Sequence, residues 1–270
     1  MNEGVIVTTY VVIDDGLKAF GQHSHVLAQM SDAEVLLVAV VAALYFQNHH
    51  ERALCVLVAM GYIGRGLSIS RFNRRLHQMA DWLPGLLMIL GELFSHGEVF
   101  VMDSMPVPVC KRARAGRCRK VRGAEYCGYC AAKKEKFFGW RLHMVCTPEG
   151  LPVAFDLLPA ALHDLTPIHE LTVDLPSGAC VYADKGYNCL PEEVTIFQET
   201  GVRLIPIRKS NMQPHAWVDD FDLRHYRRRI ETIYSQLESM GLERLHARTN
   251  TGFEIKLHAS LLALAFINLN

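Results

Sequence analysis

From residue 98 onward the sequence alternates between short apolar segments and helical patterns, and this alternation restricts the fold more than any other feature. Apolar, β-branched runs bounded by turn residues are typical of strands, whereas apolar residues three or four apart are typical of helices. The resulting order, β-β-β-α-β-α-β-α-α, predicts a mixed α/β domain. We expect strands at 98–103, 137–146, 151–158, 179–184 and 202–207, and helices at 165–173, 191–200, 222–240 and 255–269.

Residues 1–97 lack this alternation and are predicted to be helical. Ser31 and Glu34 form a capping-box pattern before a long apolar run, which predicts the start of a helix. A second helix at about 50–62 and a third, basic one around a glycine-containing turn resemble a helix-turn-helix, and an ordinary bundle with a solvated arginine face is an equal alternative. In the first case the DNA contacts are Arg71, Arg74 and Arg75.

The formal net charge is zero, with 28 Lys and Arg against 28 Asp and Glu, but the charges are segregated along the chain. Residues 103–143 carry a net charge of +8, and residues 144–202 carry −8. Such asymmetry is typical of proteins that contact nucleic acid. Half of the residues are apolar, which excludes a disordered chain.

The compartment is predicted from the apolar and cysteine content. The N-terminal residues do not resemble a secretory signal, because no basic segment precedes an apolar one. The longest apolar run, 35–46, is shorter than the roughly 20 residues that a membrane span requires. We therefore expect a cytoplasmic protein with no membrane partner, whose eight cysteines are mostly reduced thiols.

The segment 107–136 combines four cysteines with a dense basic run, and we expect it to form a loop. Cys-x2-Cys is half of many zinc sites, but the Cys-x7-Cys that precedes it is loosely spaced for structural zinc. Reduced thiols are therefore favoured over a zinc site formed by Cys110, Cys118, Cys127 and Cys130. Aromatic residues among cations are suited to stacking on unpaired bases. The expected DNA contacts are Lys111, Arg112, Arg119, Lys120, Lys133 and Lys136.

Three carboxylates are candidates for catalysis. Asp103 and Asp184 each end an apolar strand, and Glu231 lies on the long helix. Ligands of open α/β sheets bind beyond the carboxyl ends of the strands, so neighbouring parallel strands would bring both aspartates to one crevice. Clustered carboxylates repel unless a cation joins them, and oxygen ligands favour Mg²⁺ or Mn²⁺. The simpler alternatives are a turn or cap role for each aspartate and an ion pair of Glu231 with Arg227.

These segments resemble the DDE transposases of bacterial insertion sequences, the small kind with an RNase-H-like catalytic domain. The resemblance covers about residues 98–268 and is most specific in the Asp-Lys-Gly-Tyr element at 184–187 and in the arginine-rich helix with Glu231. The other matching segments are 102–106, 139–143 and 158–164.

The resemblance implies an RNase-H-like mixed sheet of five strands in the order 3-2-1-4-5, with flanking helices, in a catalytic domain at 98–270. It implies that residues 1–97 bind DNA and that Asp103, Asp184 and Glu231 hold two Mg²⁺ or Mn²⁺ ions as the catalytic triad. The implied reaction is cleavage at terminal inverted repeats followed by strand transfer into target DNA. A homodimer on DNA is expected because two ends must be paired, and the implied location is the bacterial nucleoid.

Related enzymes often carry a Tyr and an Arg before the Glu and a Lys seven residues after it. In this sequence Arg227 matches the Arg, but Arg224 replaces the Tyr and Glu238 replaces the Lys. Further phosphate contacts are therefore expected from Arg228 and Lys185. Two alternatives remain, a non-catalytic or zinc-dependent DNA-binding protein and a nuclease of the same fold without strand transfer. No catalytic role is assigned to His143 or His163.

Overall fold

The computed structural model describes residues 1–131, 133–209, 212–213 and 220–269. The contacts divide the chain into two compact units, Met1–Ile89 together with Leu237–Asn270, and Leu90–Gln236. The first unit is helical and the second contains the sheet. The C-terminal helix, which the sequence places with the strands, therefore belongs to the helical unit by its contacts.

The helical unit is built around α2 (Asp32–Phe46), which is apolar on all sides and buried along most of its length. A helix of this kind must be covered by others. It contacts α1 (Glu3–Ala19), α3 (His50–Ala59), α4 (Ile69–Gln78) and α9 (Asn250–Asn268). The predicted capping box is confirmed, because the Ser31 side chain accepts from the Glu34 backbone while the Glu34 carboxylate accepts from the Ser31 backbone.

The two helices expected to form a helix-turn-helix are α3 and α4. Residues 60–68 connect them, a longer connection than the turn of about 3–4 residues that the motif uses. Arg71 and Arg74 are exposed on α4. Arg75 instead forms an ion pair with Asp32 and donates to the Met30 carbonyl. Its guanidinium therefore stabilises the helical unit, while the other two arginines remain open to solvent.

Asn48, which follows α2, joins distant parts of this unit. Its buried amide Nδ2 donates to the Met240 carbonyl at 3.1 Å and to the Ser260 hydroxyl at 2.9 Å, and its φ of 63° is left-handed. We expect Asn48→Gly to lower the free energy of unfolding by about 1–3 kcal/mol, because Gly keeps the backbone but leaves Ser260 and Met240 without these bonds. Asn48→Ala should cost about 1 kcal/mol more through backbone strain. Urea denaturation measures both, and a glycine variant as stable as the wild type would contradict this role.

The second unit contains a six-stranded sheet in which the predicted order is confirmed. The path β4-β3-β1-β5-β6 corresponds to 3-2-1-4-5, with β1–β5 and β5–β6 parallel and β1–β3 and β3–β4 antiparallel. Gly150, at φ 103°, lies in the predicted turn between β3 and β4. The strands are β1 (Val99–Lys111), β2 (Cys127–Cys130), β3 (Glu135–Cys146), β4 (Pro152–Pro159), β5 (Cys180–Ala183) and β6 (Arg203–Pro206).

Two predictions for the segment between β1 and β3 are wrong. The first strand does not stop at Asp103 but continues to Lys111, paired with β3, so the expected loop 107–136 begins inside a strand. The sheet also has a sixth strand, β2, paired with the start of β3. Because β1 pairs with β5 only as far as Met102, its later residues form a separate antiparallel ribbon with β3. Short helical turns at Arg112–Arg117 and Ala124–Tyr126 complete the connection.

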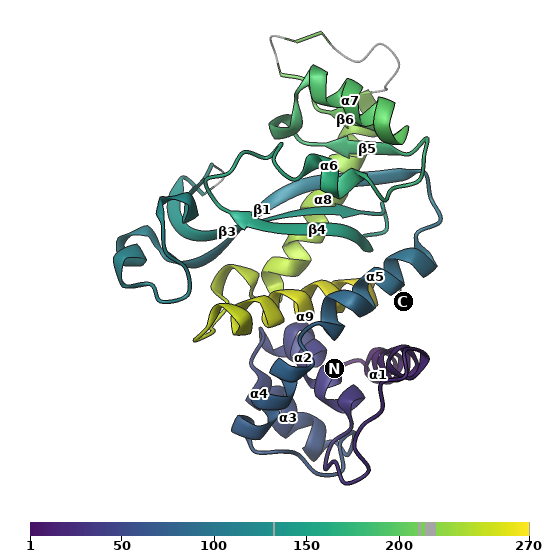
Figure 1. Ribbon diagram of the computed structural model, residues 1–270, viewed down its shortest axis with the longest axis vertical. Helices are drawn as coiled ribbons and strands as arrows, with labels where there is room; N and C mark the ends of the chain where they lie inside the picture. The colour runs from purple at the N-terminus through teal and green to yellow at the C-terminus, as the bar shows by residue number, and fades with distance from the viewer. Residues whose placement is uncertain (132, 210–211, 214–219, 270) are drawn as a thin grey trace. The chain divides into compact units, whose positions relative to one another are not determined.

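Helices cover both faces of the sheet, as parallel strands require. In Figure 1, α6 (Ile168–Thr172) lies in front of the strands and α8 (Asp220–Ser239) passes behind them. α6 also contacts β4 and α7 (Leu190–Thr200). α8 is tied to the β3–β4 turn because Arg229 Nε donates to the Pro148 carbonyl at 2.7 Å. No helix in the described part of the chain has the length and apolar character needed to cross a membrane.

Candidate active site

Asp103 and Asp184 come from neighbouring parallel strands. Met102 and Ala183 are partners in the β1–β5 pair, and each is followed directly by one of the two aspartates. The two carboxylates therefore lie at the same level, just beyond the last paired residues of β1 and β5. Ligands of α/β sheets bind at this edge. Asp184 follows the end of β5 as expected, whereas Asp103 lies inside β1.

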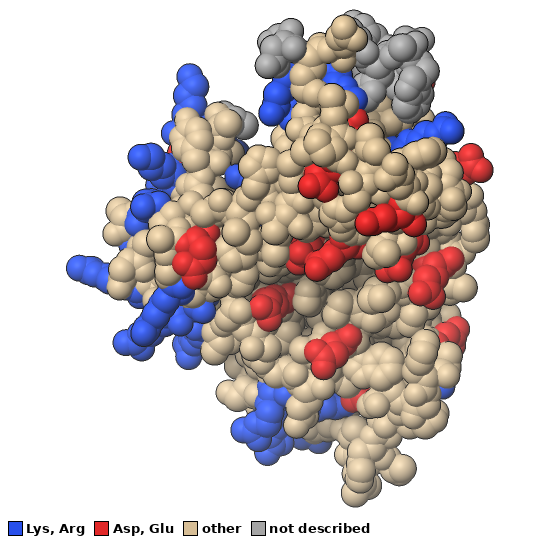
Figure 2. Space-filling view, turned by 45° about the horizontal axis from the view of Figure 1, so that its top comes forward, with Lys and Arg blue, Asp and Glu red and all other residues tan. Residues whose placement is uncertain are grey.

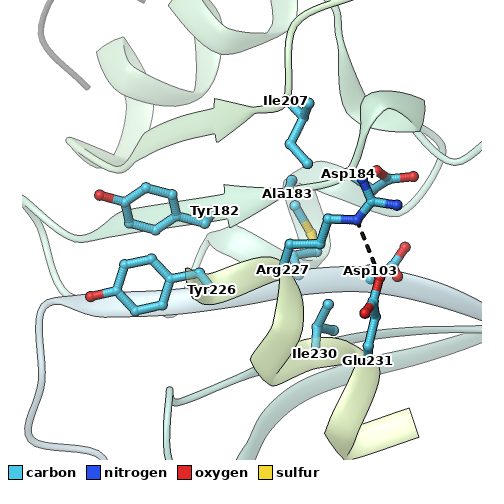
Figure 3. Close-up of a pocket in the computed structure, with 10 residues that line it drawn as sticks. Asp103, Tyr182, Ala183, Asp184, Ile207, Tyr226, Arg227, Ile230 and Glu231 are labelled. Atoms are coloured by element: carbon cyan, nitrogen blue, oxygen red, sulfur yellow. Dashed lines mark hydrogen bonds and ion pairs between the residues drawn. The ribbon is translucent and has the colours of Figure 1, made fainter. Parts of the chain in front are cut away.

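Glu231 reaches the same place from α8. The three acidic residues line one open cleft of about 460 Å³. Figure 3 shows their carboxyl groups at one end of the cleft, beside the Arg227 guanidinium, with two tyrosine rings at the opposite end. These rings, Tyr182 of β5 and Tyr226 of α8, are stacked with centroids 4.4 Å apart at an angle of 30°.

The sequence pattern did not identify the two tyrosines as part of the site. Tyr182 could have been found, because it lies two residues before Asp184 and alternate residues of a strand share a face. Tyr226 lies next to Arg227, near the place where related enzymes carry a tyrosine that Arg224 replaces here. The stack closes one end of the cleft with aromatic surface and leaves the carboxylates at the other.

The charge state of Asp103 is set by its surroundings. Burial raises the pKa of Asp103 to about 7, and the negative charges of Asp184 and Asp164 act in the same direction. A hydrogen bond from the Ser104 backbone N–H, 2.7 Å from Oδ1, opposes this shift, as does Arg141. Asp103 therefore keeps its proton close to neutral pH. A cation bound beside it would favour the ionised carboxylate.

Glu231 is engaged with Arg227 one helical turn earlier. Arg227 Nε donates to Glu231 Oε1 at 3.2 Å, and the two side chains are 56% and 62% exposed. An exposed pair of this kind contributes about 0.2–1 kcal/mol, so a stronger partner can displace it. Within the described chain no three His, Cys, Asp or Glu side chains converge closely enough to hold an ion. The donors Asp103 and Asp184 suit a hard cation, and Glu231 would join them by leaving Arg227.

The predicted phosphate-binding residues beside the cleft differ in position. Arg227 lines the cleft, Lys185 is exposed directly after Asp184, and Arg228 is exposed on α8. His143 and His163 are not among the residues that line the cleft. Burial lowers the pKa of His143 to about 4, so that its ring is neutral. His163 Nδ1 accepts from the Leu165 backbone N–H, which is a local turn contact.

The basic segment presents its cations to solvent. Figure 2 shows Lys and Arg gathered at the left of the molecule, on the projection formed by residues 107–136. Lys111 lies 3.6 Å from Glu135 but remains largely exposed. Tyr129 of β2, which is the strand partner of Lys136, is 51% exposed. Of the predicted contacts in this segment, the exposed ones are Lys111, Arg112, Arg119, Lys133 and Lys136, and Lys120 is half-buried.

Two of the four cysteines in the same segment lie next to each other. Cys110 and Cys118 hydrogen-bond to each other, and burial raises the pKa of the Cys110 thiol. In the region that the structure describes, no group of three His, Cys, Asp or Glu side chains is placed to hold a metal ion. All eight cysteines are free thiols. The zinc alternative for Cys110, Cys118, Cys127 and Cys130 stays a prediction.

The chain was compared with models of protein families. Residues 95–266 match the model of the family described as Transposase DDE domain. This range includes Asp103, Asp184 and Glu231 and covers more than half of the chain. No match was found among curated proteins or among solved structures.

Proposed function

Because the chain belongs to the Transposase DDE domain family, we propose that it is an insertion-sequence transposase that cuts DNA at terminal inverted repeats and joins the freed ends to target DNA. Family membership supports transposase function and action on nucleic acid in general. The observation that carries the specific reaction is the meeting of Asp103, Asp184 and Glu231 in one cleft. Carboxylates from two strands and a helix suit a metal-dependent displacement at phosphorus.

The residues of the cleft divide into two roles under this proposal. Asp103, Asp184 and Glu231 would hold two Mg²⁺ or Mn²⁺ ions, which when bound would activate the attacking oxygen and stabilise the leaving oxygen. Arg227, which is paired with Glu231 in the structure, would contact a phosphate of the DNA end. Lys185 and Arg228 contribute further backbone contacts, which position the strand without reading its sequence.

The proposal assigns residues 1–97 to DNA binding and residues 98–270 to catalysis. The protein acts as a homodimer on DNA, since two element ends must be joined in one reaction, and it works at the bacterial nucleoid. Arg71 and Arg74 are the N-terminal contacts that this assignment uses, because both are exposed on α4.

The exposed cations of 107–136 are expected to dominate the salt dependence of DNA binding. Removing two of them in Lys111→Ala/Arg112→Ala should weaken binding to all sequences alike and reduce the slope of log K against log salt by about 2, since each phosphate contact contributes about 1. Fluorescence anisotropy at several salt concentrations measures the slope. Lys18→Ala is the control, because Lys18 pairs with Asp14 on α1. A slope equal to that of the wild type would remove this segment from the DNA interface.

One reaction distinguishes the proposal from its alternatives. Purified protein is incubated with Mg²⁺ and a labelled DNA end that carries the terminal repeat of its own element, together with a target plasmid. Joined products support a transposase. Cut ends without joining indicate a nuclease of the same fold, and a mobility shift without cutting indicates a DNA-binding protein that is not catalytic.

A further inference from the structure

Ser104 is the starting point, because it follows Asp103 on β1 and alternate side chains of a strand point to opposite faces. Its hydroxyl donates to Asp164 Oδ1 at 3.0 Å. Arg141 Nη1 lies 3.2 Å from the same hydroxyl and 3.4 Å from Asp164 Oδ1. The side chains of Arg141 and Asp164 are only 20% and 25% exposed, so this ion pair is largely sheltered from water. Asp164 is therefore fixed to β1 next to Asp103.

The turn that carries Asp184 rests on the same carboxylate. A Cβ atom built on Gly186 would lie 2.5 Å from Asp164 Oδ2, so no side chain larger than hydrogen fits there unless Asp164 moves. This close approach explains glycine at the third position of the Asp-Lys-Gly-Tyr element without invoking a positive φ. One carboxylate thus touches the strand of Asp103 through Oδ1 and the turn of Asp184 through Oδ2.

Tyr187 makes a second connection between the two aspartates. Its side chain is 1% exposed, and its hydroxyl lies 3.0 Å from Nδ1 of His143, which is completely buried. The Ser104 and Tyr187 side chains also hydrogen-bond. His143 is the β3 partner of Ser104, so Tyr187 is held by two adjacent strands. We name these five residues, Ser104, Arg141, His143, Asp164 and Tyr187, the polar brace.

We infer that the polar brace sets the separation of Asp103 and Asp184, and that Asp164 and Tyr187 are positioning residues of the reaction. This inference rests on the proposed function. No member of the brace is among the residues that line the cleft. Its contacts fall on the residue that follows Asp103, which is Ser104, and on Gly186 and Tyr187, which follow Asp184. The brace therefore determines where a shared cation would find its ligands. Residues that orient metal ligands typically contribute about 10–100-fold in affinity or activity.

Two single substitutions disturb the brace while leaving the cleft intact. Tyr187→Phe removes only the hydroxyl, and Gly186→Ala adds one methyl group against Asp164. For both we expect a kcat lowered about 10–100-fold at saturating DNA, a weaker affinity for Mn²⁺ measured by electron paramagnetic resonance, and an unchanged Kd for DNA. The matched control is Asp174→Asn, which alters an exposed aspartate of the same unit.

A double-mutant cycle tests the contact itself. Asp164→Ala removes the carboxylate that Gly186→Ala collides with, so the added methyl group should have little further effect on Mn²⁺ affinity in that background. Circular dichroism and thermal unfolding verify that each variant is folded. If Gly186→Ala does not fold, Tyr187→Phe alone decides the question, because loss of one hydroxyl leaves the packing unchanged.

The outcomes separate the two proposals. If the wild type cuts and joins DNA while Tyr187→Phe and Gly186→Ala match it in kcat and Mn²⁺ affinity, the brace is merely structural and the inference is overturned. If the wild type binds no Mn²⁺ and cuts no DNA, the proposed function fails first. Weaker Mn²⁺ binding and lower kcat in both variants, with DNA affinity retained, support the brace.

Discussion

Asp184→Asn is expected to reduce DNA cleavage and strand transfer by about 10²–10³-fold or more, with little change in DNA affinity. Asp184 is exposed at the end of β5 and lines the cleft with Asp103 and Glu231. Asparagine keeps the shape of the side chain but removes the negative charge that attracts a divalent cation. The rates of cleavage and of strand transfer should fall together, because each step is a displacement at phosphorus that uses the same carboxylates.

The measurement is a gel assay of cut and joined products beside a mobility shift of the same DNA end. Asp174→Asn provides the same chemical change at an exposed position outside the cleft, and it should behave as the wild type. Retained cutting by Asp184→Asn would remove this residue from the triad.

Asp103→Asn is expected to abolish both steps as well, yet to stabilise the metal-free protein at pH 8. The folded protein holds the Asp103 proton up to a pKa of about 7, whereas the unfolded chain releases it near 3.8. Between pH 3.8 and about 7 the folded state binds more protons than the unfolded state. The free energy of unfolding therefore falls as the pH rises through this range, and the loss is complete above about pH 7. Asparagine carries no charge at any pH and still accepts from the Ser104 N–H.

Urea denaturation in the presence of EDTA tests whether the Asp103 charge destabilises the folded protein. The variant should exceed the wild type by on the order of 1–3 kcal/mol at pH 8, and the difference should shrink toward pH 4, where the wild-type carboxyl group is protonated. A variant less stable than the wild type at pH 8 would show that Asp103 is not held in a neutral, buried state. The combination of lost activity and increased stability is typical of a charge retained for function.

The strand pattern was sufficient to place Asp184 directly after the end of β5, where ligands of open sheets bind. Asp103 lies inside β1 instead, and it comes level with Asp184 because β1 pairs with β5 only as far as Met102. The strand order came from the family resemblance and agrees with the structure. The length of β1 was not predictable, because its later residues include Pro106 and Pro108 and pair only with β3. β2 was missed because four residues, Cys-Gly-Tyr-Cys, carry no strand period.

The contacts between side chains that are far apart in the chain were not predictable from the sequence. The all-apolar character of α2 predicts that other helices cover it, but nothing in the pattern of α9 identifies it as one of them. The brace was equally hidden, since Arg141, Asp164 and Tyr187 are distant in the chain and meet only after the sheet has formed. The pairing of Arg227 with Glu231 was foreseen as an alternative to catalysis, and the structure has both the pair and the cleft.

The shared metal site of the three carboxylates is best tested by a Mn²⁺ titration of the protein bound to its own DNA end, followed by electron paramagnetic resonance. If Asp103, Asp184 and Glu231 form one metal site, the wild type should bind about two ions, as a two-metal phosphoryl-transfer site does. Asp103→Asn, Asp184→Asn and Glu231→Gln should each lose at least one ion or weaken its binding. Equal Mn²⁺ binding by the wild type and all three variants would show that these carboxylates do not form the metal site.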